Sequence, residues 1–123
     1  MKSRENLVRL KQFQVNEKRR QLVQLQMMIA EFDRMAGELE LQIVAEERKA
    51  GIADINHFAY PTFAKAARLR RDNLKNSQFD LAQQKSAAEA VLAEAEAELS
   101  KAELLELRDI KSRDGDGRNA MIG

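Results

Sequence analysis

The chain has 123 residues, with one proline, no cysteine, and 21 basic against 20 acidic side chains. A charged fraction of 33% with only 5% aromatic residues is typical of long helices and coiled coils, and it argues against a compact globule with a bulky core. The balanced charge argues against a generic nucleic-acid binder, and the lack of cysteine excludes disulfides, thiolate zinc sites and cysteine nucleophiles.

A first helix is predicted from about residue 3 to residue 50, a segment that contains no proline and one glycine. Every seventh residue is apolar, in the series Val8, Val15, Leu22, Ile29, Ala36, Ile43 and Ala50. The residues three positions later are apolar at the centre and charged toward the ends: Lys11, Lys18, Leu25, Phe32, Leu39 and Glu46. Six successive heptads of this kind predict a left-handed coiled coil.

A connector is predicted over residues 51–60, where no helical period is present. Gly51 suits the left-handed residue that commonly ends a helix. Proline is favoured in the first turn of a helix, where its missing N–H is no loss. Pro61 therefore predicts that a second helix begins near residue 61.

The second helix is predicted over about residues 61–111, because no further proline and no glycine occurs in that segment. Its seven-residue series is Ala67, Leu74, Leu81, Ala88, Ala95 and Ala102, and the stripe is widened by Val91, Leu92, Leu99 and Leu105. Residues 112–123 are polar and contain glycine, which predicts a flexible tail. Residues 1–111 are thus expected to form one helical unit.

Blocks of charge along the chain predict how the two helices pair. Residues 1–20 carry a net charge of +5 and residues 89–106 one of −5, while residues 31–47 carry −5 and residues 65–75 carry +4. Folding the chain back at the connector sets each basic block beside an acidic one, whereas a parallel arrangement would set like charges together. Single exposed pairs contribute only ~0–1 kcal/mol, but a pattern reversed along both helices disfavours the parallel arrangement.

The predicted fold class is therefore all-α, with two long helices forming a left-handed antiparallel coiled-coil hairpin. At about 1.5 Å per residue each helix would be roughly 70 Å long. The contact line between the helices, here called the seam, has large apolar residues near the connector, but Lys11, Lys18, Ala95 and Ala102 near the termini. Large-to-alanine changes typically cost ~2–5 kcal/mol, so the terminal end is expected to fray and to order fully only against a partner.

The same charges leave one alternative open. Since the first helix alternates in sign along its own length, an antiparallel dimer of two first helices is also allowed. The hairpin is favoured over that dimer because the connector gives its two helices a high effective concentration. We therefore expect a monomer when the protein is free.

No catalytic residue, cofactor site or metal site is predicted, and the protein is not expected to be an enzyme. The sequence lacks a glycine-rich phosphate loop, and its acidic residues fall on solvated helix faces without an apolar pocket to shift their pKa values. The only histidine, His57, lies in the connector, where a structural or exposed role is expected. No secretory h-region and no apolar run of about 20 residues is present, so we expect a soluble, cytoplasmic protein.

Two sets of residues along the predicted hairpin are candidates for partner binding. On the outward face of the first helix, Phe13, Met27 and Leu41 alternate with arginines, including Arg20 and Arg34. They are either scattered surface apolar residues, which are common, or a contact line for a third body, such as a partner protein.

The second set lies in the connector and the start of the second helix, where Phe58, Tyr60 and Phe63 fall within six positions. A small core that closes the hairpin is the favoured interpretation, and a docking knob is the alternative.

A basic run that includes Arg68, Arg70 and Arg71 forms a third candidate surface. We expect it to be the charge partner of residues 31–47 in the first helix. A docking surface for an acidic protein is the alternative, and nucleic acid is a distant third.

Residues 58–68, Phe-Ala-Tyr-Pro-Thr-Phe-Ala-Lys-Ala-Ala-Arg, are followed by Arg-Arg-Asp-Asn-Leu at residues 70–74. With the basic amphipathic start and the long first helix, this segment resembles the flagellar export protein FliJ family, in its short alphaproteobacterial form. The resemblance implies a cytoplasmic, stalk-like component of the flagellar type III export apparatus at the base of the flagellum, with a role in motility and chemotaxis. The partners implied are the export ATPase hexamer, which it would bind and stimulate, the cytoplasmic domain of the export gate, and export chaperones that it would escort.

Two other functions fit the same sequence. One is the equivalent stalk of a virulence type III secretion system, and the other is a purely structural coiled-coil spacer or homodimer. The near-neutral charge makes a nucleic-acid-associated coiled coil improbable. Membrane insertion is not expected, and association with a membrane would be peripheral, through the export apparatus.

Overall fold

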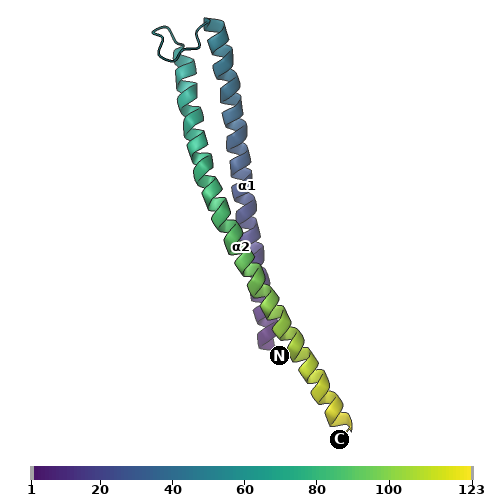
Figure 1. Ribbon diagram of the computed structural model, residues 1–123. Helices are drawn as coiled ribbons and strands as arrows, with labels where there is room; N and C mark the ends of the chain where they lie inside the picture. Colours follow the sequence, from purple (N-terminus) through teal and green to yellow (C-terminus); the bar gives the residue numbers. More distant parts are fainter. Residues whose placement is uncertain (1, 123) are drawn as a thin grey trace. The chain divides into compact units, whose positions relative to one another are not determined.

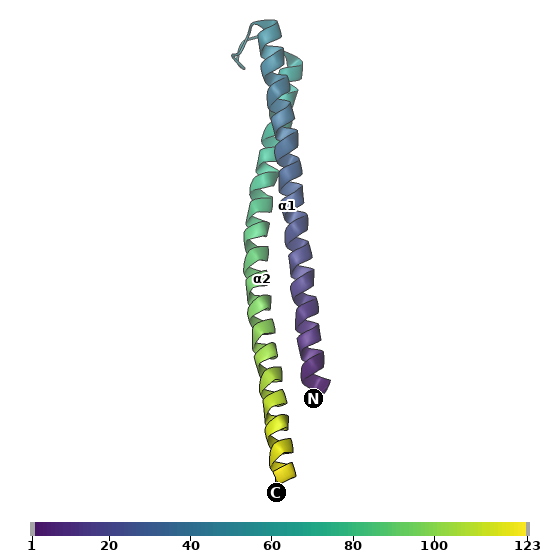
Figure 2. The same cartoon turned by 90° about the vertical axis from the view of Figure 1, so that its right-hand side faces the viewer.

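The computed structural model describes the backbone of residues 2–122 and the side chains of residues 3–113. Helix α1 spans Lys2–Ala50 and helix α2 spans Thr62–Ile122, and the connector runs between them (Figures 1 and 2). Residues 2–122 contain no strand, and the two long helices pack against each other. The prediction of an all-α protein with two long helices is confirmed.

Helix α1 ends at the residue that the sequence predicts. Gly51 has a φ of 70°, and its N–H donates to the carbonyl oxygen of Arg48 at 3.3 Å. The N–H of Ile52 donates to the carbonyl oxygen of Glu47 at 3.2 Å. These two bonds form a Schellman cap, which satisfies carbonyl groups that the end of a helix leaves without partners.

Helix α2 begins where the sequence predicts but ends later than predicted. The carbonyl oxygen of Pro61 accepts the N–H of Lys65 at 3.1 Å, so the first helical bond of α2 starts at the proline. The predicted end near residue 111 is wrong, since the helical backbone continues to Ile122 through most of the predicted tail, 112–123. No proline follows Pro61, and a glycine in a helix costs only about 1 kcal/mol relative to alanine, so the polar segment contains no strong helix breaker.

The chain divides into two compact units, each of which is described by itself. In the unit of residues 24–86, Leu39, Ile43 and Ala67 form a buried cluster against which Leu74 packs. All four belong to the predicted seam. Burial of these side chains contributes hydrophobic stabilisation to helix pairing in this unit, and Ala36, Ala64 and Leu81 are buried as well.

The other unit contains residues 1–23 and 87–123. Val15 is 1% exposed and Ala102 is 4% exposed, and the Nζ of Lys11 lies 2.8 Å from Glu98 Oε2. Lys11 is a seam position in the heptad pattern, so an ion pair here takes the place of an apolar contact.

The seven-residue series in α1 is buried or half-buried at every position except Ala50. Ala50 is exposed because it is the last residue of α1, where the backbone turns into the Gly51 cap. In the part of the chain that the structure describes, neither helix has a stretch apolar and long enough to cross a membrane.

Candidate protein-binding surfaces

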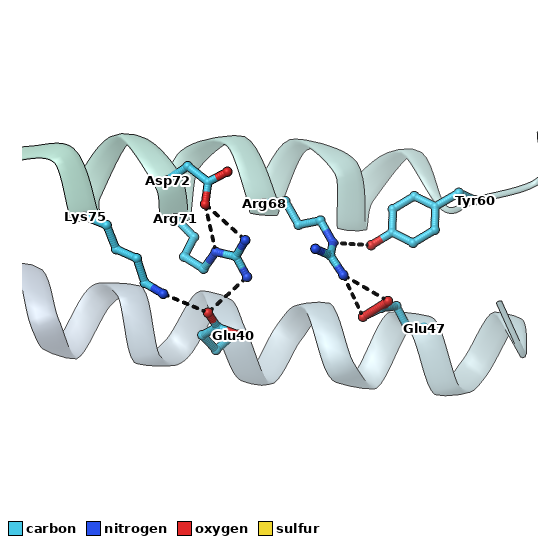
Figure 3. A network of polar contacts seen from close by, with 7 residues as sticks. All are labelled: Glu40, Glu47, Tyr60, Arg68, Arg71, Asp72 and Lys75. Carbon is cyan, nitrogen blue, oxygen red and sulfur yellow. Dashed lines mark hydrogen bonds and ion pairs between the residues drawn. The ribbon is translucent and has the colours of Figure 1, made fainter. Parts of the chain in front are cut away.

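A polar network joins the end of α1, the connector and the start of α2 (Figure 3). Arg68 Nε donates a hydrogen bond to the hydroxyl oxygen of Tyr60 at 2.7 Å, and its Nη2 lies 3.2 Å from Glu47 Oε2. The guanidinium carbon lies 5.8 Å from the centre of the Tyr60 ring, within the range of a cation–π contact. The hydrogen bond to Tyr60 is the main cause that raises the pKa of Arg68, and Glu47 adds to it.

The basic run contains a second set of contacts one turn further along α2. Arg71 Nη1 pairs with Glu40 Oε1 at 3.0 Å, and Lys75 Nζ lies 3.4 Å from the same oxygen (Figure 3). Arg71 also pairs with Asp72 at 3.0 Å. Arg68 and Arg71 are therefore charge partners of the acidic block in α1, which agrees with the favoured interpretation of this run.

Two cations of the same run are left without such a partner. Arg70 and Lys65 are exposed, and neither forms an ion pair with any of the residues whose side chains the structure describes. These two cations, rather than Arg68 or Arg71, are available to an acidic partner.

The connector is fixed by hydrogen bonds of its own. The N–H of His57 donates to the carbonyl oxygen of Asp54 at 3.1 Å, and the N–H of Tyr60 donates to that of His57 at 3.0 Å. Asp54 Oδ1 accepts from the N–H of Asn56 at 2.9 Å, and His57 Nδ1 accepts from the N–H of Ala59 at 3.0 Å. His57 thus has a structural role, and the segment is a set of linked turns with a defined conformation.

The aromatic residues of this region separate into one buried and two exposed side chains. Tyr60 is 8% exposed, whereas Phe63 is 54% exposed and Phe58 is 97% exposed. Tyr60 lies two residues before α2, and its hydroxyl oxygen accepts the hydrogen bond from Arg68. The prediction of a small aromatic core is therefore wrong for Phe58 and Phe63.

The ring of Phe58 stacks on that of His57, with centroids 4.8 Å apart and planes inclined by 22°. Close to the connector, an open apolar groove of about 450 Å³ runs along the start of α2. Leu69, which lines this groove, is 63% exposed. Leu69 belongs to the predicted basic run but is not among the predicted contact residues, although an apolar side chain among four cations is the signal that could have found it. The groove is lined by Ile55, Thr62, Lys65, Ala66, Arg68, Leu69 and Asp72.

The apolar residues predicted on the outward face of α1 are exposed. Phe13 is 58%, Met27 67% and Leu41 73% exposed. Phe13 belongs to the unit of residues 1–23 and 87–123, and the other two belong to the unit of residues 24–86. Each presents an apolar side chain that neither helix of its own unit covers.

The arginines between them are held within α1. Arg20 pairs with Glu17 at 2.7 Å, and Arg34 pairs with both Glu31 and Glu38 at 2.5 Å. The hydrogen bond that Arg34 donates to Glu31 lowers the pKa of Glu31, and the same hydrogen bond is the main cause that raises the pKa of Arg34. Pairs of this spacing contribute only ~0.2–0.5 kcal/mol, so a partner could compete for either arginine at little cost.

No protein-family model, no curated protein and no solved structure matches this chain. Function is therefore argued from its surfaces and from the sequence. Among the described residues, no group of three or more histidine, cysteine, aspartate or glutamate side chains is placed to hold a metal ion.

Sequence reasoning missed one further surface, on α2. Leu104 is 61% and Leu107 50% exposed, beside an open hollow of about 620 Å³. The signal was present, since apolar or small residues recur there at spacings of three and four in addition to the predicted seam. The hollow is lined by Ser100, Glu103, Leu104, Glu106, Leu107 and Ile110.

Proposed function

We propose that the chain is a left-handed antiparallel coiled-coil hairpin. Support comes from the order of the ion pairs in each unit. In one, Arg4 pairs with Asp109 and Lys11 with Glu98, so the partner's number falls as the number in α1 rises. In the other unit, Glu40 pairs with Arg71 and Glu47 pairs with Arg68, so the order is the same. The heptad series supports the coiled coil and its hand.

We further propose that this hairpin acts by binding other proteins and has no catalytic chemistry of its own. The observation that carries this proposal is Phe58, which is 97% exposed on a connector whose conformation is fixed by hydrogen bonds. Aromatic residues are enriched among the anchors of protein interfaces. Because the connector is already ordered, burying this ring against a partner would lose little conformational entropy.

The resemblance of residues 58–74 to the FliJ family suggests the identity of the partner. We propose that the protein is a stalk-like component of flagellar type III export, which binds and stimulates the export ATPase ring at the base of the flagellum. In the same proposal it contacts the export gate and escorts export chaperones. A stalk of this kind does not need to make or break covalent bonds. When it binds one conformation of a ring subunit more tightly than another, it shifts the populations of the two conformations.

In this proposal the surface residues have different roles. Phe58 and the groove that Leu69 lines supply apolar contact, while Lys65 and Arg70 steer an acidic partner toward these surfaces. Exposed charges of this kind change the rate and specificity of association more than its affinity. Arg68 and Tyr60 contribute indirectly, by holding the connector against α1.

The test is to titrate the protein into the purified export ATPase and to measure ATP turnover and ring assembly. We expect stimulation, and we expect Phe58→Ser to weaken it by about tenfold or more in half-maximal concentration, as loss of an interface anchor worth ~2 kcal/mol implies. Phe79→Ser is the matched control, because Phe79 is also exposed, at 65%, but lies away from the connector in sequence. If the unaltered protein changes neither turnover nor assembly, the stalk proposal is wrong.

The rival assignment to a virulence type III system is tested in the same assay. A virulence export ATPase replaces the flagellar one, and the concentration of the protein that gives half-maximal stimulation is compared between the two. Stronger stimulation of the virulence enzyme would move the proposal to that system.

A further inference from the structure

Between residues 93 and 108, helix α2 has one face that packs on α1 and an opposite face that is exposed among the side chains that the structure describes. Ala102 is 4% exposed and Asp109 pairs with Arg4 of α1, so these two residues mark the inner face. Leu104 and Leu107 lie on the other side of the helix and are 61% and 50% exposed. Together with Ile110, they are the large apolar residues that line the open hollow of about 620 Å³.

The outer face carries a heptad pattern of its own. The residues Ala93, Ala97, Ser100, Leu104 and Leu107 follow one another at alternating spacings of four and three, and all five are exposed. This alternation is the pattern of a coiled-coil contact line, with small residues at one end and leucines at the other. Helix α2 therefore has a second seam, which no part of the described chain covers.

The charged residues beside this second seam indicate what could cover it. In heptad terms, Ala97 and Leu104 are a positions, each preceded by a glutamate at g, Glu96 or Glu103. Ser100 and Leu107 are d positions, each followed by a cation at e, Lys101 or Arg108. In a parallel pair of helices, a g residue faces the e residue five positions later on the other helix. Two copies of α2 would thus set Glu96 beside Lys101 of the second copy, and Glu103 beside Arg108 of the second copy.

The same charges decide the direction of such a pair. In an antiparallel arrangement g residues face g residues and e residues face e residues, so glutamates would meet glutamates and cations would meet cations. Like charges brought together in this way are destabilising. Glu96 already forms an ion pair with Arg19 of α1, with Arg19 Nη2 3.7 Å from Glu96 Oε1. Glu103 and Arg108, by contrast, have no ion-pair partner among the described residues. Glu103 and Arg108 are therefore the charges available to pair between two copies.

From this charge complementarity we propose that residues 93–108 of α2 form a parallel two-stranded coiled-coil contact with the same segment of a second copy of this chain. The proposal is independent of the export assignment, since it uses only the outer face of α2. Each chain contributes two leucines and three small residues, which makes a small interface of the weak, transient kind. The dissociation constant is therefore expected between about 1 µM and 1 mM. At concentrations well below that constant, the free protein is expected to be a monomer.

Sedimentation equilibrium of the whole protein over about 1 µM to 1 mM tests the proposal, because that range covers the expected dissociation constant. We expect a reversible monomer–dimer equilibrium that weakens about tenfold in Glu103→Arg, since two symmetric pairs change from attraction to repulsion. The double variant Glu103→Arg with Arg108→Glu exchanges the two charges and should restore the affinity. Phe79→Ser is the matched control, since Phe79 is an exposed apolar residue of α2 that lies outside the second seam.

Each other result overturns the proposal in a distinct way. A chain that stays monomeric up to about 1 mM would contradict any dimer of the expected strength. A tighter dimer in Glu103→Arg would indicate an antiparallel contact, in which the new arginine meets a glutamate. A double variant that fails to recover would show that these charges do not face each other. Circular dichroism of each variant at low concentration checks that its helix content is intact.

Discussion

Gly51 ends α1 in a conformation that costs other residues free energy. Its φ of 70° lies in the left-handed region, and no described atom lies within 4 Å of the position that an added Cβ would take. We therefore expect Gly51→Ala to lower the free energy of unfolding by about 1–2 kcal/mol through backbone strain alone. Urea denaturation followed by circular dichroism measures this change.

Gly37 provides the matched control for that substitution. It lies inside α1 and is equally open around its Cβ position, but its φ is not positive. Gly37→Ala should raise the free energy of unfolding by about 0.5–1 kcal/mol, because alanine loses less conformational freedom than glycine on entering a helix. Two changes of the same sign would contradict the assignment of Gly51 as a conformational cap.

Lys11 and Glu98 form an ion pair whose effect can be measured by titration. The hydrogen bond from Lys11 lowers the pKa of Glu98 from its ordinary 4.5. The charged carboxylate is the form that this pair stabilises, so its contribution to stability is present above pH 4.5 and is lost as the pH falls through the lowered pKa. We expect Lys11→Met to raise the pKa of Glu98, as measured by carboxyl NMR.

The same spectra contain an internal control. The pKa of Glu31 is lowered by Arg34 within α1, so it should not respond to Lys11→Met. An unchanged pKa of Glu98 in the variant would mean that Lys11 and Glu98 are not paired in solution.

At the scale of the helices, the sequence predicts the seam well because burial on a helix repeats with a fixed period. The cluster of Leu39, Ile43, Ala67 and Leu74 lies at predicted positions. The end of α2 could not be predicted as well, because polar composition is only an indirect signal of where a helix stops. The backbone continues to Ile122, beyond the predicted end near residue 111.

The connector is where prediction from sequence is weakest. It has no period, so nothing in the pattern alone indicated that Phe58 would be exposed while Tyr60 would be buried. That difference depends on specific contacts, namely the turn bonds of Asp54 and His57 and the hydrogen bond from Arg68 to Tyr60. Each of these contacts depends on an individual donor and acceptor, which a periodic pattern does not indicate.

The two units are expected to differ in local stability. The buried apolar cluster lies in the unit of residues 24–86, whereas the other unit has an ion pair at the seam position Lys11. Amide hydrogen exchange should therefore be slower around Leu39 and Ile43 than around residues 5–11, because opening the first region exposes more apolar surface. Equal protection along α1 would contradict the prediction that the terminal end is the weaker one.

At the scale of the whole molecule, charge serves two purposes. Arg68, Arg71 and Lys11 are used within the chain, where they pair one helix with the other. Arg70 and Lys65 have no ion-pair partner among the described residues and remain available to other proteins. The sequence predicted the pairing between blocks, but it could not separate these two groups of cations, because the difference depends on which face of α2 each residue occupies.

The proposed hairpin, on which the export assignment rests, requires that α1 and α2 of one chain pair in antiparallel order. Carbodiimide treatment tests this directly, since it joins a lysine to a carboxylate only when the two are in contact. In a dilute mixture of isotope-labelled and unlabelled protein, we expect Lys11–Glu98 and Lys75–Glu40 cross-links in which both peptides come from the same chain. A cross-link from Lys11 to Asp72, near the start of α2, would instead indicate a parallel pair. Cross-links found only between labelled and unlabelled chains would indicate a dimer, and either result would contradict the hairpin.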